Sequence, residues 1–295
     1  MQGNWRGTLL FPGGFPDNLL MRGSARSGAL HPLWVAIPAL ILAVLAALVL
    51  GVVSVHKAKE RGRFDKVDKE STLGMADEFE KAIEGQELSG KTSFPDTPIG
   101  NMNRILYDNA NGLQKRERAF EKELDAIGWD WVMSPDSMRT KKSLQEALRR
   151  VNKTRETFAT YRRDYLRNFE QLLERLKPYS LQSRDARDYY AGLRNAAKLP
   201  GSGTHFMNRT AVLAAKNHDA IENALRFLLR RVGRYSVADD GTIYFSATVP
   251  QREVDAFNKL NDTINSTAAQ ISNLDRERVE RARFGLQRMR EELAK

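Results

Sequence analysis

Histidine is the side chain whose chemistry is easiest to recognise here, and only His205 and His218 occur after residue 57 of this 295-residue sequence. Histidine binds metal ions and transfers protons near neutral pH. The two histidines are thirteen positions apart, a spacing that matches neither H-x-x-x-H nor H-E-x-x-H. We therefore predict surface or capping histidines, with no metal site.

Glycine-rich and cysteine-based sites are the next candidates for chemistry. The stretch Gly201-Ser202-Gly203 lacks the lysine and the length of a phosphate-binding loop, so we interpret it as a flexible connection. Cysteine is absent, which excludes disulfides, thiolate metal sites and cysteine nucleophiles. No catalytic residue and no cofactor is predicted, and the sequence favours a protein that is not an enzyme.

Basic residues are concentrated in the helix that we predict between positions 136 and 177, in a chain of net charge +10. Such a face could bind a polyanion. The interleaved Glu146, Glu156, Asp164 and Glu170 favour the alternative, a solvated face with salt bridges. No nucleic-acid-binding module is recognisable, so no specific nucleic-acid binding is expected. The candidate polyanion face consists of Lys142, Arg149, Arg150, Lys153, Arg163 and Arg167.

An uncharged apolar stretch, residues 33–55, precedes all of these groups. It is long enough to cross the ~30 Å hydrocarbon core of a bilayer. We predict a single transmembrane helix over 31–56 that acts as an uncleaved signal anchor. Small residues recur in it at every fourth position, which is typical of a homodimer seam and also arises by chance in an alanine-rich span. The candidate dimer face consists of Ala39, Ala43, Ala47 and Gly51.

Two rules disagree on the orientation of this span. Arg22 and Arg26 precede it, whereas six lysines and arginines come after it within about 15 residues, which places the rest of the chain in the cytoplasm. A short basic lead-in is, however, the usual start of a signal anchor that exports the C-terminal part of its chain. Residues 1–30 are rich in Gly, Arg, Ser and Pro and are predicted to be disordered, with Met1 and Met21 as alternative starts.

The spacing of apolar residues predicts an all-α fold, an elongated bundle of long antiparallel helices. A juxtamembrane helix and a loop occupy 57–98, where glycines and prolines predict a hinge. The bundle occupies 99–295 and carries one small β-hairpin near 235–245, because apolar residues alternate around Asp240-Gly241. Pro178 is predicted to end the third helix, and the last helix is expected to project into solvent beyond Asp275. The predicted helices are 64–83, 99–127, 136–177, 184–198, 208–232 and 251–295.

Residues 240–260, with the helices that flank them, resemble a family of uncharacterised bacterial helical proteins anchored in the cell envelope. The resemblance rests on Gly241, Ile243, Phe245, Pro250, Asn258, Lys259 and Leu260. This chain departs from the family at its anchor, because a protein span replaces a lipidated cysteine. The resemblance implies no catalytic residue, and it implies an extracytoplasmic location.

These patterns support two hypotheses about function. The first is a non-enzymatic helical binding or scaffold module of the bacterial envelope, anchored in the inner membrane with its body in the periplasm. Its partners would be the membrane, a second copy, and an envelope protein or an anionic polymer. The alternative is a cytoplasmic, membrane-tethered coiled-coil scaffold for division or shape, which contacts anionic lipid.

Overall fold

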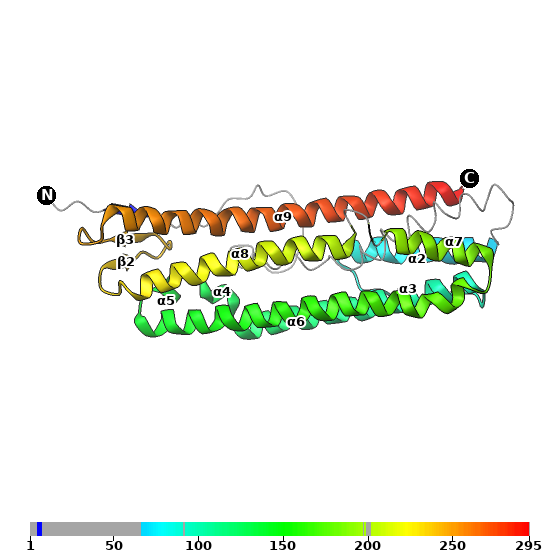
Figure 1. Ribbon diagram of the computed structural model, residues 1–295, viewed down its shortest axis with the longest axis horizontal. Coiled ribbons are helices and arrows are strands. Elements are labelled where there is room, and N and C mark those ends of the chain that lie inside the picture. The colour runs from blue at the N-terminus through cyan, green and yellow to red at the C-terminus, as the bar shows by residue number, and fades with distance from the viewer. Residues whose placement is uncertain (1–4, 8–65, 91, 197, 199–201, 295) are drawn as a thin grey trace. The chain divides into compact units, whose positions relative to one another are not determined.

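The computed structural model describes residues 5–7, 66–90, 92–196, 198 and 202–294. Most of these residues are helical, and a small antiparallel sheet accompanies the helices (Figure 1). The helices are α2 (Lys66–Ile83), α3 (Pro98–Ile127), α4 (Trp129–Val132), α5 (Pro135–Met138), α6 (Lys141–Ser180), α7 (Arg184–Ala196), α8 (Gly203–Leu229) and α9 (Gln251–Ala294). The strands are β1 (Trp5–Gly7), β2 (Tyr235–Val237) and β3 (Ile243–Phe245).

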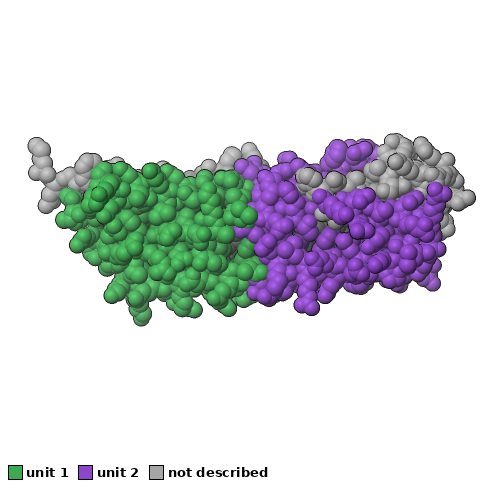
Figure 2. Space-filling view, in the orientation of Figure 1, with its two compact units in different colours: residues 1–35, 121–159, 212–272 green, residues 36–120, 160–211, 273–295 purple. Residues whose placement is uncertain are grey.

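The chain divides into two compact units, coloured separately in Figure 2. Unit 1 comprises Met1–Val35, Glu121–Ala159 and Val212–Ser272, and unit 2 comprises Ala36–Phe120, Thr160–Ala211 and Asn273–Lys295. The predicted helices and the hairpin lie close to their expected positions. Several boundaries differ. The helix predicted over 136–177 is divided into α5 and α6, and α8 begins at Gly203 and ends at Leu229 instead of spanning 208–232. Pro178 lies inside the last turn of α6, which ends at Ser180.

The predicted transmembrane helix requires a correction. In the described part of the chain, no helix is long and apolar enough to cross a membrane. The physical reason is that these helices confine their apolar residues to one stripe and carry charged residues on their other faces. The correction extends to the membrane, single-pass and signal-anchor assignments. The stretch that suggested them, with its proposed dimer face Ala39, Ala43, Ala47 and Gly51, lies outside the described residues.

Unit 1 contains the sheet, whose strand order is β1-β3-β2 with both pairings antiparallel. Gly241 adopts φ 83° in the turn between β2 and β3, a left-handed conformation that glycine tolerates best. Phe245 of β3 packs with its ring centroid 5.8 Å from that of Phe227 and 5.3 Å from that of Phe257. The hairpin thereby joins the core between α8 and α9. Strand β1 was not predicted, since it lies within the range expected to be disordered.

His218 lies in the core of unit 1, which corrects its assignment as a surface or capping residue. Its side chain is 1% exposed, and its ring meets that of Trp129 edge to face at 5.3 Å between centroids. Burial, and to a smaller extent the charge of the nearby Arg155 guanidinium, lowers the pKa of His218 to about 4. The imidazole is therefore neutral at pH 7 and serves as a packing group.

We predict that His218 makes the stability of the protein depend on pH. Its pKa is lowered on folding, so its full contribution is present above about pH 6.5 and is lost as pH falls toward 4. The loss amounts to up to about 3 kcal/mol, at about 1.4 kcal/mol per pKa unit. His218→Gln cannot titrate, so its free energy of unfolding should fall less between pH 7 and pH 4.5. Denaturant unfolding at both pH values measures this, and parallel losses in both proteins would contradict it.

Unit 2 has its own apolar core, to which α2, α3, α6, α7 and α9 contribute. A buried polar chain crosses it: Tyr189 Oη donates to Asn103 Oδ1 at 2.8 Å, and Asn103 Nδ2 donates to Thr72 Oγ1 at 2.9 Å. The end of α9 does not project into solvent as predicted. Its buried apolar side chains there include Ala282, Leu286, Met289 and Leu293.

Candidate functional site

One face of α2 lines a groove of about 530 Å³ in unit 2. The α2 residues that line it have helical spacing, so they form a continuous strip along the helix. The opposite wall comes from the segment between α2 and α3. The lining consists of Val67, Glu70, Ser71, Gly74, Asp77, Glu78 and Lys81 on α2, and of Ser89, Thr92, Ser93 and Pro95 on the segment. The lining includes four hydroxyl and three carboxylate side chains.

Two glycines help to shape the groove. A Cβ added at Gly74 would lie 3.8 Å from Thr92 Cγ2, which is ordinary contact, so residue 74 lies close to the opposite wall. Gly100, in the first turn of α3, has a stricter role. A Cβ there would come within 2.2 Å of the Pro95 carbonyl oxygen, so only glycine lets this wall approach α3 so closely.

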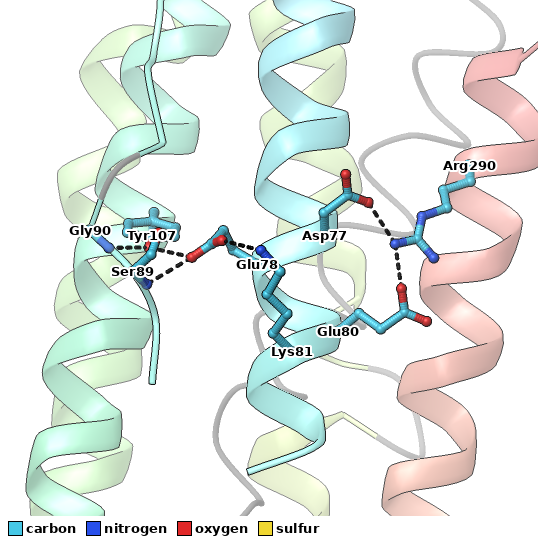
Figure 3. A network of polar contacts seen from close by, with 8 residues as sticks. All are labelled: Asp77, Glu78, Glu80, Lys81, Ser89, Gly90, Tyr107 and Arg290. Atoms are coloured by element: carbon cyan, nitrogen blue, oxygen red, sulfur yellow. Dashed lines mark hydrogen bonds and ion pairs between the residues drawn. The ribbon is translucent and has the colours of Figure 1, made fainter. Parts of the chain in front are cut away.

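The carboxylate of Glu78 joins the two walls (Figure 3). Oε2 accepts a hydrogen bond from the Ser89 amide at 2.7 Å and one from Tyr107 Oη at 3.3 Å. Oε1 accepts one from Lys81 Nζ at 2.9 Å. The Tyr107 hydroxyl also accepts a hydrogen bond from the Gly90 amide at 2.9 Å. A single ionised side chain therefore connects α2, α3 and the segment between them.

The pKa of Glu78 shows how this environment acts on the carboxylate. Burial alone would raise the pKa, but hydrogen bonds from Ser89 and Lys81 and the charge of Lys81 lower it to about 2. The same contact raises the pKa of Lys81. Glu78 is thus ionised and Lys81 protonated near neutral pH, so neither is suited to be a general base there.

Further contacts hold the opposite wall against α3. The Leu88 amide donates to Gln114 Oε1 at 3.2 Å, and Gln114 Nε2 donates to the Gln86 carbonyl at 2.9 Å. The ring centroids of Phe94 and Tyr107 lie 5.6 Å apart. The segment is thus bound at several points. The hinge that its glycines and prolines suggest stays a prediction.

The far side of α2 is held by α9 (Figure 3). Arg290 Nη2 donates to Asp77 Oδ1 at 2.7 Å and to Glu80 Oε2 at 2.6 Å. Arg290 would therefore keep one carboxylate partner if Asp77 lost its charge. The side chain of Asp77 is 62% exposed, so it also borders the groove on its solvent side.

The residues of the predicted polyanion face are distributed over both units. Lys142, Arg149, Arg150 and Lys153 belong to unit 1, whereas Arg163 and Arg167 belong to unit 2. Glu146 binds Arg149 at 2.7 Å and Arg150 at 2.8 Å, and these two hydrogen bonds lower its pKa to about 2. Arg150 also lies over the Trp131 ring, 4.5 Å from its centroid. Polyanion binding at this face stays a prediction.

No residue of the groove was predicted from the sequence to belong to a functional site. A signal was present, because Val67, Ser71, Gly74, Glu78 and Lys81 recur at helical spacing. Only Val67 among them has a large apolar side chain, so a search for apolar stripes does not detect this face of α2. As for metal ions, no group of three or more potential ligands occurs within the ranges that the structure describes.

No family model matches this chain, and no curated protein or solved structure matches it. The resemblance carried by Gly241, Ile243, Phe245 and the helix start after them therefore stays a prediction. The candidate site has to be judged on its own geometry.

We predict that Glu78→Gln destabilises unit 2 by about 2 kcal/mol at pH 7, because hydrogen bonds to a charged acceptor are lost. The pKa of Glu78 is lowered on folding, so its contribution is complete above about pH 4.5 and is lost as pH falls toward 2. The variant should lack this part of the acid destabilisation. Denaturant unfolding between pH 7 and pH 3 measures both effects, with the exposed Glu84→Gln as the control. Equal behaviour of the two variants would contradict the prediction.

Proposed function

We propose that this protein is a non-enzymatic helical binding module, and that the groove on α2 is where it receives a partner. The groove itself carries the proposal, because its walls are preorganised by Glu78 and its lining offers hydroxyl and carboxylate groups. Rigid walls reduce the entropy lost on binding. The protonation states of Glu78 and Lys81 favour binding over acid–base chemistry.

Other parts of the function stay predictions from the sequence. These are the envelope location with its extracytoplasmic side, the cytoplasmic scaffold as the alternative, and a second copy or an anionic polymer as partner. The groove is compatible with either cellular side, because it depends only on contacts within unit 2.

Gly74 gives a direct test of the groove. Gly74→Leu should fill the space between the walls, whereas Gly74→Ala adds a Cβ at ordinary contact distance and should stabilise α2 by up to about 1 kcal/mol. A photo-crosslinking residue at Val67, which is 49% exposed and lines the groove, should yield a discrete adduct in cells that produce the full chain. Gly74→Ala should keep that adduct, and Gly74→Leu should abolish it.

The control position is Val212, which is 70% exposed and belongs to unit 1. The proposal fails if Val212 gives the same adduct as Val67. It also fails if the Val67 adduct persists in Gly74→Leu. Circular dichroism and thermal unfolding of both Gly74 variants verify that the filled groove belongs to a folded protein.

A further inference from the structure

The outer face of the hairpin β2–β3 lines a pocket of about 460 Å³ in unit 1. Figure 1 shows this hairpin beside the end of α8 and the start of α9. Arg234, Ser236, Tyr244 and Ser246 belong to the pocket lining. Ser236 pairs with Tyr244 in the strand register, and the Ser246 amide donates to the Arg234 carbonyl at 2.9 Å. Because side chains alternate between the two faces of a strand, these four residues share one face.

The lining of this hairpin pocket offers hydrogen-bond donors, and no acidic residue of the described part of the chain contributes to it. The donors are the guanidinium of Arg234 and three hydroxyls. The Ser246 hydroxyl already shares a hydrogen bond with that of Thr248 at 2.7 Å. The side chains of Arg234, Ser236 and Tyr244 form no hydrogen bond or ion pair within the described residues. These three groups are therefore available to a ligand.

Contacts on the inner side of the hairpin hold the pocket in shape. Phe245 is 1% exposed and packs in the core of unit 1, and Tyr235 Oη donates to the Met138 carbonyl at 2.5 Å. Gly233 adopts φ 86°, and the Arg234 amide that follows it donates to the Arg231 carbonyl at 2.8 Å. The backbone that carries the donors is thus fixed before a ligand binds, which reduces the entropy lost on binding.

Positive charge exceeds negative charge beside the pocket. Arg231 binds Glu253 at 2.5 Å, and its guanidinium lies over the Phe227 ring, 3.6 Å from the centroid. The pKa of Glu253 is lowered by this hydrogen bond, and also by the charges of Arg231, Arg252 and Arg234. Three guanidinium groups therefore act on one carboxylate. Arg234 and Arg252 are exposed, and neither has an ion-pair partner in the described part of the chain.

We propose that the hairpin pocket binds a phosphate monoester, with Arg234 forked onto the phosphate oxygens and with Ser236 and Tyr244 as further donors. A phosphate monoester carries about two negative charges near neutral pH and three acceptor oxygens. Arginine presents planar donors that match phosphate geometry, and the field of Arg231 and Arg252 favours a dianion. This inference goes beyond the proposed function, because it concerns unit 1 and does not depend on the groove on α2.

The test measures ligand affinity of the full chain by isothermal titration calorimetry at neutral pH. The two probes are glycerol 3-phosphate and malonate, a dicarboxylate of similar charge. Glycerol 3-phosphate should bind more tightly than malonate, and higher salt should weaken its binding. Arg234→Gln should weaken it roughly tenfold, because hydrogen bonds between charged groups are lost. Arg234→Lys keeps the charge but not the planar fork, so it should show an intermediate loss.

The matched control is Lys216→Gln, which removes one positive charge from an exposed position of unit 1 outside the pocket lining. It should change the affinity less than twofold. Circular dichroism and thermal unfolding verify that the Arg234 variants stay folded. The inference is overturned if glycerol 3-phosphate does not bind, if malonate binds as tightly, or if Lys216→Gln weakens binding as much as Arg234→Gln does.

A competition experiment distinguishes the two sources of a phosphate monoester, which are soluble metabolites and the headgroup of phosphatidic acid. The competitors are phosphatidylcholine vesicles with and without phosphatidic acid. Displacement of glycerol 3-phosphate only by the vesicles with phosphatidic acid assigns the pocket to the lipid headgroup, and no displacement assigns it to a soluble monoester. Displacement by both kinds of vesicle contradicts the inference, because phosphatidylcholine has no phosphate monoester.

Discussion

The ionised carboxylate of Glu78 is the constraint on which the groove of unit 2 depends. Only 10% of its side chain is exposed, and an isolated carboxylate would be unstable there. Donors from three directions compensate it: Lys81 one turn along α2, the Ser89 amide on the opposite wall, and Tyr107 on α3. Because Gly90 donates to the same Tyr107 hydroxyl, the wall and the helices are ordered together. This cooperative arrangement explains why a glycine- and proline-rich segment forms a defined surface.

Helix positions could be predicted largely from the sequence, whereas their ends and surroundings could not. Apolar spacing locates α2, α3 and the hairpin, because burial of one stripe decides those elements. It fails for Pro178, since a proline in a final turn disrupts few backbone hydrogen bonds. It also fails for the end of α9, where dense charge hides a buried stripe that includes Leu286 and Met289. Strand β1 depends on a partner some 240 positions away, which local patterns do not show.

The candidate site was harder to predict than the fold, because polar residues are buried in it for reasons set by tertiary contacts. His218 shows the same difficulty in unit 1, where its ring packs against Trp129 although histidine is common at surfaces. Arg278 is a comparable case in unit 2, since it is 4% exposed and pairs with Asp275. A buried polar residue is stable only when particular partners are present. Sequence spacing identifies helix faces, but it does not identify those partners.

The three carboxylates of the groove show how position on one helix changes the surroundings of a side chain. Glu78 lies on the inner side of α2, where hydrogen bonds hold its pKa at about 2 and use most of its acceptor capacity. Glu70 and Asp77 lie on the same strip but remain largely exposed, so solvent or a ligand can reach their oxygens. Neutralising Glu78 would loosen the walls, whereas neutralising Asp77 would remove one of the two contacts that Arg290 makes with α2. The inner carboxylate therefore defines the shape of the groove, and the outer two lie at its exposed edge.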